Sequence, residues 1–277
     1  MKVVSVVGSK NSGKTTLISR LIPVLKRHGS VGVVKHIHSQ FDSPGKDTEK
    51  FSSAGAEVVI AVTPEETVKI ASGGDLFRAI DELSDAGIDF ALIEGFKSSD
   101  IPKIAIGDVA AENILKRVDP DVDPEELLNL IFGLEDYFTL NSLILKARSG
   151  PNIDKVGAIG TFTGIVRGIT GETVVKALDF EKYGGVAEER IGSIIDDLKE
   201  REGVVDVLIH HRSGYIETGS DIVYVVVAGS HRGDVFSALS LAIERVKEEV
   251  PIWKKEITID GDYWVHDKMI GEDKVDR

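Results

Sequence analysis

The sequence predicts an α/β protein of two consecutive domains: one with a mostly parallel sheet, followed by an α+β domain with largely antiparallel pairing. The first half alternates short apolar runs with amphipathic stretches, which is typical of parallel strands joined by crossover helices. The second half has longer strand-like runs and two helical stretches. The 277 residues, 42% of them hydrophobic, are enough for each domain to bury its own core.

Apolar spacing identifies the elements of the first half. The apolar residues of Leu17–Leu25 fall on one face of a helix that stops at Gly29, and Leu76, Ile80 and Leu83 mark a second helix. Short apolar runs between these helices predict strands. The predicted strands are Val3–Val7, Val31–Lys35, Val58–Val62, Phe90–Glu94 and Lys103–Ile106.

Prolines mark the boundary between the domains. The acidic stretch Asp119–Asp123 breaks the alternation and precedes a short helix from Pro124 to about Phe132. We therefore expect a first domain over residues 1–138 and a second over residues 139–277. The second is predicted to contain strands at Val156–Arg167, Thr173–Tyr183, Val204–His211, Asp221–Gly229 and Trp253–Asp260, and helices at Val186–Lys199 and Gly233–Glu249.

The composition argues against several classes of protein. A formal net charge of −13 and an isoelectric point near 5.0 disfavour nucleic-acid binding, because phosphate backbones need a surplus of Lys and Arg. The absence of cysteine excludes a disulfide, a cysteine nucleophile and a thiolate metal site within this sequence. No apolar run approaches a signal peptide or membrane span, so we expect a cytoplasmic protein that does not bind membranes.

A phosphate-binding loop follows the first predicted strand. Residues 8–15 match the pattern G-x-x-x-x-G-K-[ST] between an apolar strand and an amphipathic helix. In such a loop backbone N–H groups face the phosphates, Lys14 reaches the β- and γ-phosphates, and the Thr15 hydroxyl can ligate Mg²⁺. We therefore predict nucleotide binding by Gly8, Ser9, Lys10, Asn11, Ser12, Gly13, Lys14, Thr15 and Thr16.

A carboxylate and two histidines are further candidates in this half. Glu94 ends the apolar run Phe90–Ile93, so its side chain is expected at the carboxyl edge of the sheet, where a magnesium-orienting acid is needed. The alternative is a solvated glutamate at a strand end. Thr15 and Glu94 are the predicted magnesium residues. His36 and His38 lack an evident third ligand, which favours a polar loop over a metal site.

Five strings of the first half form a wider pattern: Val33–His36, Pro44–Thr48, Ala54–Ala56, Leu92–Lys97 and Pro102–Ile104. Together with the phosphate loop they resemble the MobB family of molybdopterin-guanine dinucleotide biosynthesis adaptors. The resemblance implies binding of GTP with Mg²⁺, slow hydrolysis, dimerisation, and assistance to a MobA-like guanylyltransferase. The residues by themselves support only a phosphate-loop nucleotide binder, because no N-K-x-D string that would read guanine is evident.

Basic residues stand out against the acidic background of the second half: Arg167, His231-Arg232, Lys247 and Lys254-Lys255. Pro251 ends the second long helix, so Lys247 lies in its last turn and Lys254 on the next strand, and both ammonium groups can reach one pocket. Such a cluster could hold a dianion, and a lysine crowded by cations has a lowered pKa and can act as a base or nucleophile. The alternative is that these lysines are ordinary surface charges.

The strings around these residues are Phe162–Gly164, Val166-Arg167, His210–Gly214, Ser230–Arg232, Lys247 and Pro251–Glu256. From about residue 139 onward they resemble the MoaE family, the large subunit of molybdopterin synthase. This resemblance implies an α/β hammerhead fold, a homodimer, and one small ubiquitin-like, MoaD-like sulfur carrier bound to each protomer.

The same resemblance implies a reaction and its residues. Cyclic pyranopterin monophosphate would receive two sulfurs from the carrier's C-terminal thiocarboxylate to give molybdopterin, which fits the absence of cysteine here. An anion pocket would be completed from the neighbouring protomer by His231 and Arg232. Carried over by position, the catalytic residues are Lys247 and Lys254, and the substrate-binding residues are Phe162, Arg167, His231, Arg232 and Lys268.

Two other functions stay open at this point. The second domain could merely dock pathway proteins for a GTP-dependent adaptor, although intact Arg167, Lys247 and Lys254 disfavour this. The first domain could instead be a P-loop kinase for a small molecule, which a phosphorylated product would reveal.

Overall fold

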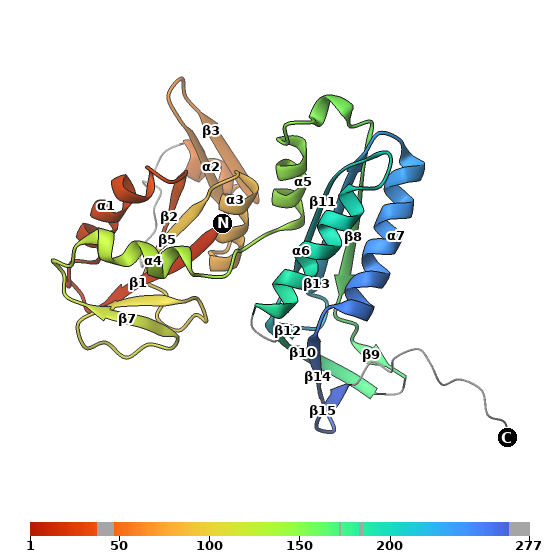
Figure 1. The fold of residues 1–277 in the computed structure, drawn as a ribbon. Coiled ribbons are helices and arrows are strands. Elements are labelled where there is room, and N and C mark those ends of the chain that lie inside the picture. Colours follow the sequence, from red (N-terminus) through yellow and green to blue (C-terminus); the bar gives the residue numbers. More distant parts are fainter. Residues whose placement is uncertain (38–46, 172, 183–184, 266–277) are drawn as a thin grey trace. The chain divides into compact units, whose positions relative to one another are not determined.

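The computed structural model describes residues 1–37, 47–171, 173–182 and 185–265. The chain divides into two compact units, Met1–Thr139 and Leu140–Arg277, and each has its own sheets and its own core (Figure 1). None of the helices in the described ranges is long and apolar enough to cross a membrane.

A five-stranded sheet forms the centre of the first unit. Its order is β2-β5-β1-β6-β7, and every neighbouring pair is parallel, as the alternating apolar runs predict. Every residue of β1 after Lys2 is buried, because β1 is the central strand and helices cover both faces of the sheet. The strands are β1 (Lys2–Gly8), β2 (Val31–Lys35), β5 (Phe90–Glu94), β6 (Lys103–Ile106) and β7 (Ile114–Val118).

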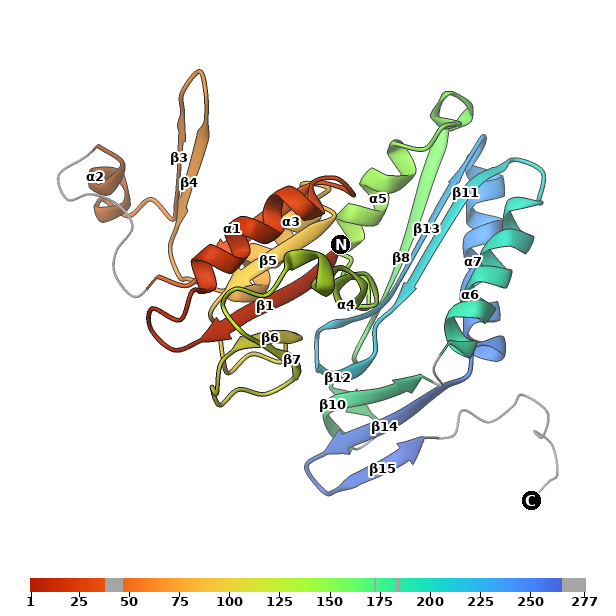
Figure 2. The ribbon, with the colours of Figure 1, turned by 60° about the vertical axis from the view of Figure 1, so that its left-hand side comes forward.

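Helices pack on the two faces of this sheet (Figure 2). Leu92 contributes to the core beneath α1, η1 and α4, whereas its neighbours Ala91 and Ile93 contribute to the core beneath α3. Successive residues of a strand point to opposite faces, so one apolar run supplies both cores. The helices of this unit are α1 (Lys14–Leu25), α2 (Asp47–Ser53), α3 (Leu76–Asp85), η1 (Pro124–Leu127) and α4 (Leu128–Phe132).

One predicted strand of the parallel sheet lies elsewhere, so that part of the prediction is wrong. Val58–Val62 does form a strand, β3, but it pairs antiparallel with β4 (Thr67–Ala71) in a separate hairpin. The N–H of Thr63 donates to the carbonyl of Glu66 (2.8 Å), so a tight turn supplies β3 with a partner from the next residues of the chain. Neither β4 nor β7 was predicted from the sequence.

The second unit contains two antiparallel sheets. One has the order β11-β13-β8 and the other β12-β10-β14-β15, with β9 paired to β10. Helices α6 and α7 pack on the first sheet around one core, and α5 packs against β11 and β13. This α+β arrangement confirms the predicted fold class. The elements are α5 (Leu140–Arg148), η2 (Ile153–Lys155), β8 (Ala158–Ile165), β9 (Ile169–Thr170), β10 (Thr173–Lys182), α6 (Val186–Lys199), β11 (Val204–His211), β12 (Gly214–Glu217), β13 (Asp221–Gly229), α7 (Arg232–Glu249), β14 (Ile252–Thr258) and β15 (Asp262–Val265).

Candidate functional site

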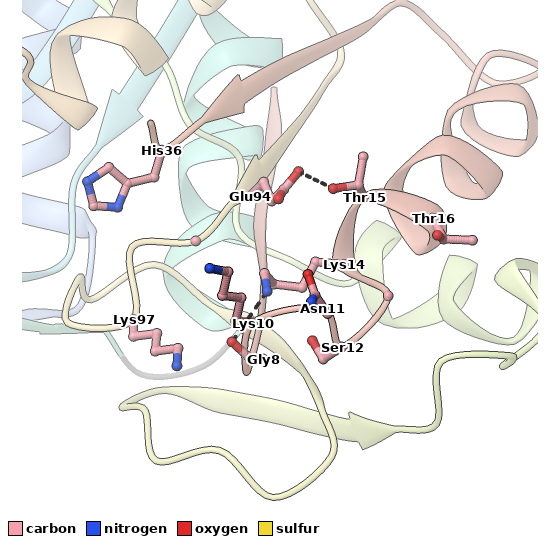
Figure 3. Close-up of a pocket in the computed structure, with 12 residues that line it drawn as sticks. Gly8, Lys10, Asn11, Ser12, Lys14, Thr15, Thr16, His36, Glu94 and Lys97 are labelled. Atoms are coloured by element: carbon pink, nitrogen blue, oxygen red, sulfur yellow. Dashed lines mark hydrogen bonds between the residues drawn. The ribbon is translucent and has the colours of Figure 1, made fainter. Parts of the chain in front are cut away.

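A pocket of about 850 Å³ lies where β1 ends and α1 begins (Figure 3). The phosphate loop forms one wall, and every predicted nucleotide residue except Ser9 lines the pocket. The parallel connection places the amino end of α1 at the carboxyl edge of the sheet, where α/β proteins bind their ligands. The lining residues are Gly8, Lys10, Asn11, Ser12, Gly13, Lys14, Thr15, Thr16, His36, Glu94, Gly95 and Lys97.

Small residues allow the loop to turn sharply. Asn11 has φ 61° and Gly13 has φ 89°, both in the left-handed region that Asn and Gly tolerate best. A Cβ atom at Gly8 would lie 2.3 Å from Ser12 Oγ. Lys14 Nζ donates to the carbonyl of Ser9 (2.6 Å), so its ammonium lies against the loop from which it comes.

Thr15 and Glu94 meet in the lining of this pocket (Figure 3). Thr15 Oγ1 donates to Glu94 Oε2 at 2.9 Å, and Lys35 Nζ lies 3.3 Å from the same oxygen. The Glu94 side chain is only 15% exposed, so it is not the solvated strand-end glutamate of the alternative interpretation. A hydroxyl and a carboxylate in contact are hard oxygen donors, which suit Mg²⁺.

The second wall of the pocket comes from the carboxyl ends of β2 and β5. It contains His36, Gly95 and Lys97 besides Glu94. His36 stacks on the ring of Phe96 with centroids 4.4 Å apart. Gly95 and Lys97 were not among the predicted site residues, although both follow Glu94 closely in the chain. His38 lies outside the described residues.

In the second unit, Arg167, Lys247 and Lys254 lie at one end of the β11-β13-β8 sheet. Ile165 pairs with Asp221, so Arg167 follows β8 at the end where β13 begins. Helix α7 starts beyond the other end of β13 and runs back over it, so its last turn, with Lys247, returns to this end. All three side chains are exposed or half-buried.

One apolar cluster links these three positions. It contains Val166, next to Arg167, and Phe180, which pairs with Lys254. Ile252 packs against this cluster and also against the core that contains Val246, next to Lys247. The helix-to-strand corner predicted at Pro251 therefore brings the ends of α7 and β14 together near β8.

His231 and Arg232 lie at the opposite end of the same unit. They begin α7, whereas Lys247 lies in its last turn, so Arg232 and Lys247 are about 22 Å apart along the helix axis. Within one protomer the structure does not join these two groups. Phe162 is half-buried in the middle of β8 and packs against the core under α6 and α7. Lys268 lies outside the described residues.

Neighbouring lysines of β14 point in opposite directions. Lys254 pairs with Phe180, a buried residue, and so lies on the face of the sheet that packs against the rest of the unit. Lys255 lies on the other face and forms an ion pair with Asp262 (3.2 Å). The chain therefore offers two adjacent lysines in different surroundings.

Ion pairs hold the last turns of α7 against α6. Arg245 donates to Asp197 (2.8 Å), and Glu249 pairs with Arg190 (2.6 Å). Arg245 also donates to Glu249 (2.8 Å), and this hydrogen bond holds the pKa of Glu249 below its ordinary value. Because Lys247 lies between Arg245 and Glu249, these pairs fix the backbone that carries it.

Comparison with known proteins gives two family matches. The family described as "Molybdopterin guanine dinucleotide synthesis protein B" (MobB) matches residues 3–122, and the family described as "MoaE protein" matches residues 135–249. A "Probable molybdopterin synthase" of Haloferax volcanii is 38% identical over 273 residues, which cover 97% of this chain and 100% of that protein.

Two shorter relatives are also similar. A "Molybdopterin synthase catalytic subunit" of Ralstonia nicotianae is 35% identical over 138 residues, which cover 50% of this chain and 77% of that protein. The crystal structure of molybdopterin synthase from Staphylococcus aureus shares 38% sequence identity, covers 41% of this chain and 82% of its own, and has a TM-score of 0.39.

Proposed function

The chain belongs to the molybdopterin synthase family, and from this premise we propose that it serves molybdenum cofactor biosynthesis through both of its units. The second unit acts as the catalytic subunit, which converts cyclic pyranopterin monophosphate to molybdopterin. The first unit binds GTP with Mg²⁺ and assists a MobA-like guanylyltransferase. The observation that carries the proposal is the gathering of Arg167, Lys247 and Lys254 at one end of the second unit.

The proposed reaction needs residues that bind the substrate phosphate and residues that transfer protons. The guanidinium of Arg167 can hold the substrate phosphate through two parallel hydrogen bonds. Lys247 and Lys254 assist ring opening and move protons during sulfur addition. Each sulfur arrives on the C-terminal thiocarboxylate of a MoaD-like carrier and bonds to the pterin side chain, which gives a thioester between the carrier and the substrate. Water then cleaves the bond between the carrier's carbonyl carbon and the sulfur, so the sulfur stays on the pterin and the carrier leaves as a carboxylate. The chain itself has no cysteine to supply the sulfur.

Nucleotide binding by the first unit uses the phosphate-loop pocket. The loop N–H groups and Lys14 would hold the phosphates of GTP, and Thr15 and Glu94 would orient Mg²⁺. When bound, the ion would supply positive charge that offsets the negative charge of the nucleotide's phosphates. Thr15 donates to Glu94 at 2.9 Å, so the hydroxyl and the carboxylate that would hold the ion already lie together.

A second copy of the chain is proposed to complete the synthase site. His231 and Arg232 are too far from Lys247 to share a substrate within one protomer, because about 22 Å of helix separates them. In a twofold dimer each protomer can lend its own pair to the other's lysines. Each of the two sites then contains residues from both chains.

Mixing two inactive variants tests this arrangement. When Arg232→Ala and Lys254→Ala, each with little activity alone, are co-expressed, we expect the mixed dimers to recover about half of the wild-type rate, since each mixed dimer holds one intact site of its two. The measurement is molybdopterin formation by doubly tagged, co-purified dimers. A mixture as inactive as its parents would show that one protomer supplies the whole site.

The proposed function is tested by the full reaction. Purified protein, thiocarboxylated carrier and cyclic pyranopterin monophosphate are mixed, and dithiolene formation is followed. Product formation supports the synthase. If the carrier binds and no product appears, the second unit is a docking module, and the nucleotide pocket is where activity should be sought.

A further inference from the structure

Three lysines and a single carboxylate line the nucleotide pocket of a chain whose net charge is −13. The carboxylate of Glu94 already has partners: Lys35 forms an ion pair with it at 3.3 Å, and Thr15 donates a hydrogen bond to it. Lys14 belongs to the phosphate loop and lies against it. Among the described residues, Lys10 and Lys97 form no ion pair. The pocket therefore holds two cations beyond those that the nucleotide motif requires.

These cations come from different walls of the pocket. Lys97 lies on the segment after β5, and His36 follows the end of β2. Both line the same wall of the pocket. In Figure 3 the side chain of Lys10 extends from the phosphate loop toward the side of the pocket that carries His36 and Lys97. Both lysines line the pocket, and in Figure 3 both lie away from the contact between Thr15 and Glu94.

Two buried polar side chains donate hydrogen bonds to backbone carbonyls of the segment that carries Lys97. Ser5 Oγ donates to the carbonyl of Gly95 (2.6 Å). The ammonium of Lys103, whose residue is 0% exposed, donates to the carbonyls of Ser99 and Ile101, the latter at 2.8 Å. Burial lowers the pKa of Lys103, which reflects the cost of keeping a charge there.

The backbone of the same segment adopts costly conformations. Phe96 has φ 54°, a region in which non-glycine residues are uncommon, and Gly95 has φ 103°. A Cβ atom on Gly95 would lie 3.1 Å from the Cβ of His36, so the close approach of these two residues also needs glycine. A buried charge and a strained turn are both used to hold one short segment, which is typical of a preorganised binding site.

We propose that Lys97 and Lys10, beside His36, form a second anion subsite that takes the phosphate of a phosphate monoester while the phosphate loop holds a nucleotide. The subsite rests on the proposed nucleotide binding and adds a second ligand to the same pocket. A monoester fits better than a further contact to the nucleotide, because the loop N–H groups, Lys14 and Mg²⁺ already serve the nucleotide's own phosphates. Two flexible ammonium groups and an imidazole suit a compact dianion.

The test uses the full chain with Arg167→Ala as background, which removes the arginine of the other proposed anion site. The protein is saturated with the non-hydrolysable GTP analogue GMPPNP and Mg²⁺, and glycerol 3-phosphate is titrated by calorimetry, with inorganic phosphate in a parallel arm. We expect Lys97→Gln to weaken the binding of glycerol 3-phosphate roughly tenfold or more relative to the Arg167→Ala parent. The affinity for GMPPNP should stay within about twofold of the parent's. Lys26→Gln, an exposed lysine outside the pocket, is the matched control and should change neither.

Several results would overturn the proposal. Equal binding of glycerol 3-phosphate to Lys97→Gln and its parent would remove Lys97 from any such subsite. A parallel loss of GMPPNP affinity would assign Lys97 to the nucleotide itself. Binding of inorganic phosphate but not of the ester would limit the subsite to the free ion. If GMPPNP does not bind the parent, nucleotide binding by the first unit fails as well, and that failure is visible before any ester is added.

Discussion

Replacing Lys254 by alanine is expected to lower the rate of molybdopterin formation about 100-fold or more, because a positioned proton-transfer group contributes this much to a reaction. Lys254 lies on the inner face of β14, linked through Phe180 to the cluster beside Arg167. The rate is measured in single turnovers with thiocarboxylated carrier, and substrate affinity is measured separately. A loss of affinity with an unchanged rate would make Lys254 an anchor for the substrate.

Lys255 provides the matched control for this experiment. It is the next residue of the same strand, has the same charge, and points to the other face, where it pairs with Asp262. Lys255→Ala is expected to keep nearly the wild-type rate, and to cost at most about 1 kcal/mol in stability through its surface ion pair. Equal losses in both variants would indicate a general effect on the β-sheet rather than a role in the reaction.

Replacing Lys14 by alanine is expected to weaken GTP binding about 100-fold. We expect its ammonium to leave the Ser9 carbonyl and contact the β- and γ-phosphates when the nucleotide binds, whereas alanine offers no cation in its place. Isothermal titration of the full chain with GTP and Mg²⁺ measures the loss, and circular dichroism checks that the variant is folded.

The control for this variant is again Lys26, which is exposed just after α1 and outside the pocket. Lys26→Ala removes one positive charge from the same unit without altering the loop. We expect it to bind GTP like the wild type. If Lys14→Ala also bound GTP normally, the phosphate-loop pocket would not be the nucleotide site.

Local patterns were sufficient to predict much of both units. Strands such as Phe90–Glu94 and Lys103–Ile106 coincide with the apolar runs, because a buried strand needs apolar residues wherever it pairs. The contact between Thr15 and Glu94 was also predictable, since parallel strands bring the ends of β1 and β5 to one edge. The role of each residue there stays a prediction.

Which strands pair, and which side chains are buried, depended on the folded structure. The run Val58–Val62 has the composition of an inner strand, yet a turn at Thr63 gives it a nearby partner, and alternation of apolar residues cannot distinguish these outcomes. The burial of Lys103 beneath the segment that carries Lys97 is likewise invisible in the sequence, because a lysine is normally exposed.

Residues close together in the chain were enough to predict the phosphate loop, the order of strands and helices in most of the chain, and the corner that joins Lys247 to Lys254. The folded structure was needed to show that Arg167 lies near these lysines and that Lys255 faces away from Lys254. These outcomes depend on which strands pair and which faces are buried, and both are set by packing between distant segments.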